Sequence, residues 1–233
     1  VTAMTPITIG LAEAGGINKF LVVGATIGGA MFGDNLSMIS DTTIAATRTQ
    51  GVEMKDKFKT NFFIALPAAI LTIALLLIFG RPETAPAVVR AEFNLIKEGG
   101  IEGVLQKIKK VIKNQTTAEL GIATMVSLTD MATANNTVSI LINGSVAKEI
   151  SEEYQIDPKR TASLLDIFSC VWQGLLPYGA QILFACALIT NLDSPFQVIS
   201  MCWYQYLLAA FAILSTLIAG KRGGAKTPKQ QVK

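Results

Sequence analysis

Long apolar stretches are the feature that most constrains how this chain can fold. Crossing a bilayer takes about 20 mostly apolar residues, and four stretches are long enough: 20–47, 61–80, 119–150 and 162–190. A fifth covers residues 198–220, and residues 1–14 look like the end of a sixth. With 51% hydrophobic and only 16% charged residues, the chain is too apolar for an ordinary soluble domain. We therefore expect an all-α, polytopic membrane protein.

The basic residues predict how these stretches are oriented, because lysine and arginine collect on the cytoplasmic side of short loops. The tail 221–233 carries five basic residues and no acidic one, which predicts a cytoplasmic C-terminus. Segment 48–59 holds four basic and two acidic residues, so we expect it on the same side. The two spans that flank this segment then run opposite to the last two.

The two pairs of spans also resemble each other in their order of features. In each pair a span interrupted by small or helix-breaking residues precedes an uninterrupted one. The interruptions are Gly24, Gly28, Gly29 and Gly33 in the first pair, and Gly174, Pro177 and Gly179 in the second. The same order with inverted orientation is typical of transporters built from inverted repeats. Chance similarity between apolar helices is the alternative.

We divide the chain into four parts on this basis. Residues 1–80 form a transmembrane group from a first repeat, and residues 118–220 a group from a second. Residues 81–117 form a basic amphipathic connector, and residues 221–233 a disordered tail. The connector should begin outside, yet its lysines favour the inside, so an odd number of spans is missing before Lys107. Because the chain opens at Val1 inside apolar sequence, we expect it to be a C-terminal piece of a longer protein.

Several classes of function are excluded by residues that the sequence lacks. There is no histidine, so a proton carrier near neutral pH must be a carboxylate or, less favourably, a lysine. No nucleotide-binding loop, dinucleotide fingerprint or zinc-protease motif is present. The three cysteines lie in apolar segments without metal-ligand spacing, and the basic tail is explained by orientation rather than by nucleic acid. We expect neither an enzyme nor a bound cofactor.

A first polar island, GDNLSMISDTT at residues 33–43, follows an uncharged apolar run. A carboxylate at membrane depth is costly, by roughly 2.5–3.5 kcal/mol, so it is tolerated mainly where it handles an ion or lines a cavity. Asp34 and Asn35 disfavour helix, whereas Ser40 and Asp41 form an N-cap signal. We expect a helix, an unwound stretch and a second half-helix. Alternatively, Asp41 only caps and Asp34 only hydrogen-bonds the break.

A second polar island, DMATANNT at residues 130–137, lies inside apolar sequence. Adjacent asparagines favour an unwound turn, and their amide oxygens are hard ligands that suit Na⁺. If both ends of 119–150 are cytoplasmic, each arm is too short to span alone and suits a re-entrant hairpin with TANNT at its tip. The alternative is an ordinary helix interface, where asparagines also occur.

A third polar island contains Asp166 and Gln173 and leads into LLPYGAQ. Pro177 removes a backbone donor and disfavours helix at Leu176, so we expect this span to break there. Asp166 is either an ion-binding carboxylate or a side chain that reaches back to the cytoplasmic interface. Glu119, at a helix start, is expected to be interfacial.

The three islands together identify a family resemblance. GATIGGAMFGDNLSMISDTTIAAT, DMATANNTVSILINGSVAKEI and ASLLDIFSCVWQGLLPYGAQ resemble the NhaC family of bacterial Na⁺/H⁺ antiporters. That family belongs to a superfamily with inverted repeats and re-entrant hairpins, and it includes a malate/lactate branch. Its members are roughly twice as long. They usually carry additional apolar segments between the stretches that resemble AEFNLIK and GGIEG, which a single residue separates in this chain. The resemblance therefore implies absent N-terminal spans and an internal deletion, with Lys97 to Gly99 as the junction.

The resemblance implies a transporter that exchanges Na⁺ for H⁺ across the bacterial inner membrane by alternating access. Exchange needs a carboxylate that holds either ion but not both, and we assign this role to Asp34 and Asp41. Asn135 and Asn136 are expected to join them on Na⁺. The other expected oxygen ligands are Asn35, Ser37, Ser40, Thr42, Thr133, Thr137, Asp166 and Gln181.

Two other functions stay open at this point. One is exchange of organic anions such as malate and lactate, although apart from Arg48 the spans hold few cations to bind them. The other is an inactive fragment or a membrane-interaction module. The lipid bilayer, Na⁺ and H⁺ are the expected partners, and the sequence leaves the oligomeric state open, a homodimer included.

Overall fold

The computed structural model describes residues 1, 3–80, 112–189 and 192–222, and within these ranges the chain is helical without strands. The helices follow one another as α1 (Thr5–Gly15), α2 (Lys19–Asn35), α3 (Asp41–Gln50), α4 (Met54–Phe79), α6 (Gln115–Thr133), α7 (Asn136–Glu153), α8 (Pro158–Gln173), α9 (Ala180–Cys186), α10 (Phe196–Ile199) and α11 (Trp203–Arg222). The predicted all-α class is confirmed for these residues.

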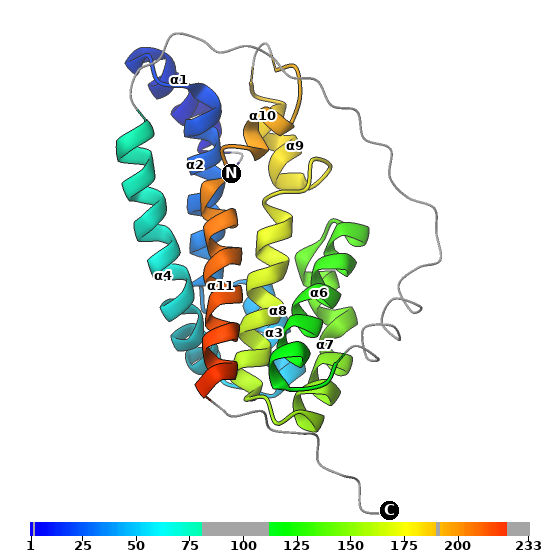
Figure 1. Cartoon of the computed structure of the whole chain (residues 1–233). Coiled ribbons are helices and arrows are strands. Elements are labelled where there is room, and N and C mark those ends of the chain that lie inside the picture. The colour runs from blue at the N-terminus through cyan, green and yellow to red at the C-terminus, as the bar shows by residue number, and fades with distance from the viewer. Residues whose placement is uncertain (2, 81–111, 190–191, 223–233) are drawn as a thin grey trace, which may run out of the picture.

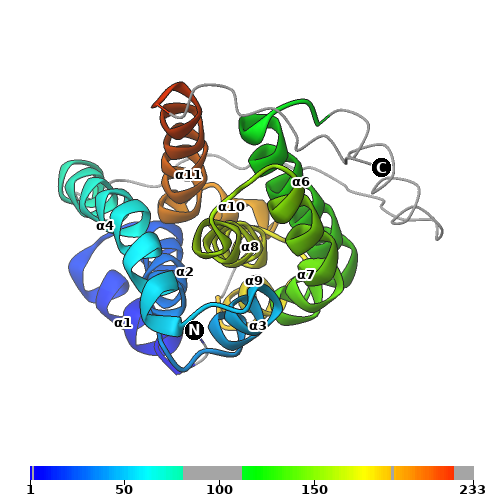
Figure 2. The same cartoon turned by 90° about the horizontal axis from the view of Figure 1, so that it is seen from below.

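Helix α8 lies at the centre of the molecule, with the other long helices around it (Figures 1 and 2). Nearly every residue from Thr161 to Val171 is buried. A helix that is buried on all sides has no solvent or lipid face, so its polar residues must find partners inside the protein. Any function that depends on a polar side chain of α8 is therefore set by the helices that pack against it.

Helix α4 is the one described helix that is long and apolar enough to cross a membrane. It is 26 residues long, and its outer face carries exposed apolar side chains such as Phe63 and Leu77. The prediction of a span at 61–80 was too short, because the helix begins seven residues earlier. Span 198–220 corresponds to the end of α10 and to the continuous helix α11, whereas the remaining three long spans are not continuous helices.

Three of the predicted spans are divided where their polar islands lie. Span 20–47 is divided into α2 and α3, span 119–150 into α6 and α7, and span 162–190 into α8 and α9. Ser40 caps α3 by accepting a hydrogen bond from the Thr43 amide, which confirms the predicted N-cap. Helix α8 ends at Gln173, three residues before the expected Leu176.

The segments predicted to be cytoplasmic meet at one end of the bundle. The α3–α4 connection, the α7–α8 connection and the end of α11 lie together at the bottom of Figure 1. Arg160 links three helices there, because it pairs with Glu119 at 2.9 Å and donates to the hydroxyl of Thr216. Glu119 is thus buried and ion-paired at this end of the bundle, and its expected place at the membrane interface stays a prediction.

Parts of the predicted division fall outside the described residues. The connector 81–117 is described only from residue 112, and the junction at Lys97 to Gly99 is not among the described residues. Of the tail 221–233, Lys221 and Arg222 belong to the end of α11. The division into four parts stays a prediction.

Two glycines of α2 allow α10 and α11 to approach it closely. A Cβ atom at Gly24 would collide with the backbone carbonyl of Met201, and one at Gly28 would lie 2.9 Å from the Cβ of Tyr204. Gly29, on the same helix, has no such neighbour within 4 Å. The glycines that interrupt the predicted span are thus not equivalent, because Gly24 and Gly28 permit close helix packing and Gly29 does not contribute to it.

Replacing Gly24 by Ala should lower the free energy of unfolding by about 1–3 kcal/mol, because the methyl group overpacks a contact with rigid backbone. Gly29→Ala is the matched control and should be neutral or stabilising by up to about 1 kcal/mol, since alanine favours helix. Unfolding of the purified chain in detergent, followed by circular dichroism, measures both. Equal stability of the two variants would contradict the packing role of Gly24.

Candidate ion-binding site

The break between α2 and α3 brings the first polar island together. Asp34 lies in the last turn of α2, and Asp41 is the first residue of α3 after the Ser40 cap. The four last carbonyls of a helix lack intrahelical partners, and the N-terminal amides of the next helix lack acceptors. A break of this kind therefore concentrates both carbonyl oxygens and carboxylates in one place. It is where a cation finds ligands most readily.

Asp34 is half-buried and contacts two other helices through one oxygen. Its Oδ2 accepts a hydrogen bond from the Thr42 hydroxyl at 3.1 Å and from the Cys170 thiol at 3.1 Å. Both donors are uncharged, and no ion pair among the described residues includes Asp34. The structure thus brings together predicted residues Asp34 and Thr42, and adds Cys170 from α8.

Asp41 is exposed and joins the second polar island. Its Oδ2 accepts a hydrogen bond from the hydroxyl of Thr137, in the first turn of α7. The tip between α6 and α7 therefore lies against the start of α3. Sequence positions 41 and 137 were predicted to share a site, and they are in direct contact.

The other residues of the tip are engaged locally. The amide oxygen of Asn135 caps α7 by accepting from the Val138 amide at 3.0 Å, and that of Asn136 accepts from the Thr137 amide at 3.0 Å. Thr133 bonds the carbonyl of Thr129 one turn back. Among the described hydrogen bonds, neither asparagine is joined to Asp34 or Asp41. That these four residues bind one Na⁺ ion stays a prediction.

A buried ion pair lies next to the break and was not predicted. The Lys57 ammonium is 2.8 Å from Oδ2 of Asp166, and both side chains are 0% exposed. The same ammonium donates to the Asn35 carbonyl at 3.2 Å and to the Thr43 hydroxyl at 2.7 Å. Asp166 therefore does not reach the cytoplasmic interface, which was one of its two predicted placements.

Asn61 completes this buried polar cluster. Its amide nitrogen donates to Asp166 at 2.7 Å and to the Asn35 carbonyl at 3.0 Å, while its oxygen accepts from the Ser163 hydroxyl at 2.6 Å. Burying an ion pair is costly unless its remaining polar atoms are hydrogen-bonded. The Asn35 carbonyl, which is free because α2 ends there, accepts hydrogen bonds from both Lys57 and Asn61. The helix break and the ion pair therefore depend on each other.

Two predicted ligands take different places. Ser37 lies in the connecting segment, where its carbonyl accepts from the Thr43 hydroxyl at 2.8 Å. Gln181 lies half-buried in the first turn of α9, and no side-chain hydrogen bond among the described residues joins it to the other predicted ligands. Within the described ranges, no three acidic or cysteine side chains lie close enough to hold a metal ion.

Lys57 was missed because it was counted with the loop 48–59 as a cytoplasmic charge. The helical signal was nevertheless present in the sequence. The buried positions of α4 recur every three or four residues through Lys57, Asn61, Ala65, Ala68 and Thr72. Extending the apolar pattern of 61–80 backwards by one turn would have put Lys57 on the buried face.

Helices that break beside buried carboxylates are typical of membrane proteins that bind and move ions. The chain belongs to the Na⁺/H⁺ antiporter family, whose model matches residues 1–81 and 93–221. It is therefore a membrane protein. No solved structure matches the chain.

Individual relatives match shorter stretches. The Na⁺/H⁺ antiporter NhaC of Alkalihalophilus pseudofirmus is 35% identical over 75 residues, which are 32% of this chain and 16% of that protein. A malate-2H⁺/Na⁺-lactate antiporter of Bacillus subtilis is 35% identical over 72 residues, 31% of this chain and 15% of that protein. An uncharacterized Na⁺/H⁺ antiporter of Haemophilus influenzae is 33% identical over 78 residues, 31% of this chain and 17% of that protein. Each match thus covers less than a fifth of the relative.

Replacing Lys57 by Met should lower the free energy of unfolding by about 3–5 kcal/mol, because Asp166 is left as a buried charge without its cation. Lys159→Met is the control, since Lys159 and its partner Asp56 are 46% and 28% exposed and such pairs contribute about 0–1 kcal/mol. Denaturation in detergent compares the two.

The double variant Lys57→Met/Asp166→Leu should regain most of the lost stability, because no unpaired charge is left. If Lys57→Met lowered the free energy of unfolding no more than Lys159→Met does, the buried pair would not stabilise the fold as proposed.

Proposed function

We propose that this chain forms the ion-binding part of a transporter that exchanges Na⁺ for H⁺ across the bacterial cell membrane by alternating access. The observation that carries the proposal is the α2–α3 break, where Asp34 and Asp41 each accept a hydrogen bond from a hydroxyl of another segment. Membership of the Na⁺/H⁺ antiporter family supports the choice of ions. No cofactor is needed beyond the transported ions.

The exchange rests on competition for the same carboxylates. A protonated Asp34 is neutral and gives up its cation, whereas an ionised Asp34 binds Na⁺ with help from nearby hydroxyls and carbonyls. The end of α2 adds to this effect, because the C-terminal end of a helix favours positive charge. Asp41 and the hydroxyls of Ser37, Ser40 and Thr42 are the further oxygens that we assign to the ion.

The buried pair explains why Asp34 rather than Asp166 exchanges. Asp166 has a permanent cation in Lys57 at 2.8 Å, and a Na⁺ ion would have to displace that ammonium. Asp34 accepts only from a hydroxyl and a thiol, which are uncharged donors that an incoming cation need not remove. We therefore assign Asp166 to holding α4 and α8 together beside the site.

The arrangement of the helices supports the predicted topology. Helices α2 and α8 approach their breaks from opposite ends of the bundle (Figure 1), as two inverted repeats would. Helices α6 and α7 pack side by side, and their tip contacts Asp41 on one side. We propose that they form a re-entrant hairpin with both ends, like the C-terminus, on the cytoplasmic side. The exposed apolar face of α4 would contact lipid. Whether two copies of the chain form a homodimer is tested by chemical cross-linking of the purified chain in detergent.

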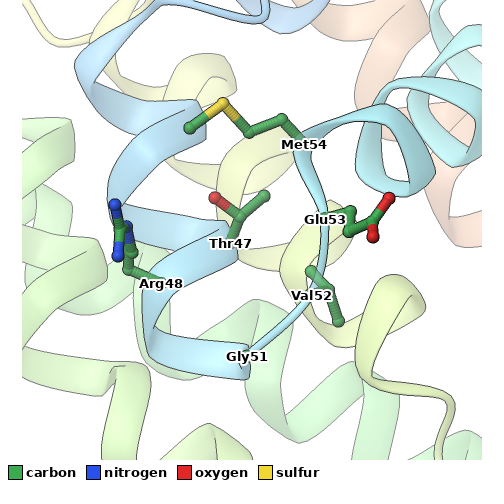
Figure 3. A pocket seen from close by; sticks show the side chains of 6 residues that line it. All are labelled: Thr47, Arg48, Gly51, Val52, Glu53 and Met54. Carbon is green, nitrogen blue, oxygen red and sulfur yellow. The ribbon is translucent and has the colours of Figure 1, made fainter.

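A second candidate is exchange of organic anions, favoured by the similarity to the malate-2H⁺/Na⁺-lactate antiporter. A cavity of about 520 Å³ between α3 and α4 is lined by Arg48 (Figure 3). The side chains of Arg48 and Glu53 point away from each other there, so the guanidinium is free to meet a carboxylate. Against this candidate, the buried Lys57 is already neutralised by Asp166. We therefore rank it second.

Reconstituted chain should show Na⁺-triggered proton flux, read with a pH-sensitive dye inside the vesicles. Asp34→Asn should weaken the apparent Na⁺ affinity by about 10- to 100-fold, because a charged ligand contributes about 1.5–3 kcal/mol and 1.4 kcal/mol is a factor of ten. Asp193→Asn, at an exposed aspartate between α9 and α10, is the matched control and should leave the flux unchanged. Flux that survives Asp34→Asn and Asp41→Asn together would remove both from the site.

Uptake of labelled malate and lactate into the same vesicles separates the two candidates. We expect no uptake above that of empty vesicles. Saturable uptake that Arg48→Gln abolishes would establish the organic-anion exchanger instead. If neither ions nor anions move while the chain is folded, it is an inactive fragment, as the sequence also allowed.

A further inference from the structure

Asp130 is a buried carboxylate without a hydrogen-bond partner. It lies in the last turn of α6 and is 0% exposed, and neither of its two carboxylate oxygens has a hydrogen-bond partner among the described residues. Asp166 is equally buried but holds Lys57 and Asn61. The two side chains thus share burial and differ in their partners.

A carboxylate in this position cannot stay ionised alone. Burying an unpaired charge costs several kcal/mol, and the C-terminal end of a helix further disfavours negative charge. None of the ion pairs among the described residues includes Asp130. Its charge must therefore be neutralised by a proton or by a cation from solution.

The surroundings of Asp130 include the break between α8 and α9. The hydroxyl of Tyr178, between α8 and α9, donates to the carbonyl of Met131, the residue next to Asp130. Ala134, four residues after Asp130, has a left-handed backbone with φ 49° and ends α6. Asp130 thus lies where the α6–α7 tip meets the α8–α9 break, whereas Asp41 contacts the other side of the tip through Thr137.

On α8 and α11, which pack against α6, three titratable groups are engaged elsewhere. On α8, Cys170 bonds Asp34, and Arg160 pairs with Glu119 at the opposite end of α6. On α11, the hydroxyl of Tyr204 accepts from Asn35. Tyr178, which is hydrogen-bonded to the residue next to Asp130, is the titratable group that the described contacts bring to this position.

We propose that Asp130 is a second exchangeable carboxylate, which carries a proton when the site is empty and a monovalent cation when Na⁺ is abundant. The inference deepens the proposed function and rests on it. It gives the chain two binding positions, one at the α2–α3 break and one where the α6–α7 tip meets the α8–α9 break. The Tyr178 hydroxyl and the carbonyls of the last turn of α6 are the oxygens that we assign to the ion beside Asp130.

Labelling with dicyclohexylcarbodiimide tests this position, because the reagent is apolar and reacts with protonated carboxyl groups in apolar surroundings. Purified chain in detergent is treated at mildly acidic pH with NaCl or with choline chloride at equal ionic strength. Adducts are located by peptide mass spectrometry. We expect Asp130 to be labelled in choline chloride and protected by NaCl, and Asp166, the matched control, to stay unlabelled in both.

A second measurement follows the protons released when NaCl is added to the purified chain in weak buffer. It does not depend on whether dicyclohexylcarbodiimide can reach Asp130. Asp130→Asn should lower the number of protons released per chain, and Asp34→Asn should lower it separately. Asp193→Asn should not change it. Protection of Asp130 by NaCl should persist in the Asp34→Asn variant, because the two positions are distinct.

The results separate this inference from the proposed function. Labelling of Asp130 that NaCl does not reduce, together with unchanged proton release in Asp130→Asn, overturns the second position even if the vesicles show Na⁺-triggered flux. Protection of Asp130 in a chain that moves no protons supports the second position and counts against antiport by this chain. Loss of protection in Asp34→Asn overturns the separation into two positions.

Discussion

The ion pair between Lys57 and Asp166 is the interaction on which the arrangement of this protein depends. Two fully buried charges 2.8 Å apart need further hydrogen bonds from their surroundings to offset the cost of their desolvation. Here α2 must end at Asn35, since its free carbonyl accepts from both Lys57 and Asn61. The pair thus fixes the distance between α4 and the central α8 and also fixes where the first helix breaks.

Asp166, Asp34 and Asp130 are aspartates buried or half-buried in the bundle, and they differ mainly in what their oxygens meet. Asp166 has a lysine and an amide, Asp34 has a hydroxyl and a thiol, and Asp130 has no hydrogen-bond donor among the described residues. The demand for an external cation or proton rises in that order, because an uncompensated charge is costly in a low dielectric. The hydrogen-bonding and ion-pair partners of each aspartate therefore suffice to assign a structural role to Asp166 and exchangeable roles to Asp34 and Asp130, although all three are the same amino acid.

The helix breaks could be predicted from sequence, because their causes are local. Asp34, Asn35 and Ser40 disfavour or restart a helix wherever they occur, and Pro177 removes a backbone donor in any surroundings. The partners of the site could not be predicted in the same way. Lys57 looked like one of four loop cations, and the thiol of Cys170 looked inert, because burial and contact depend on residues more than a hundred positions away.

What the sequence by itself determined is the helical class, the membrane setting, the positions of the polar islands and the family to which they belong. These follow from hydrophobic length, composition and local backbone preference, which are properties of short segments. Only the tertiary structure decided which polar groups are satisfied: Asp166 by Lys57, Asp41 by Thr137, and Asp130 by no donor in the described chain. Electrostatic compensation acts through space over a few ångströms, so the order of residues along the chain does not record it.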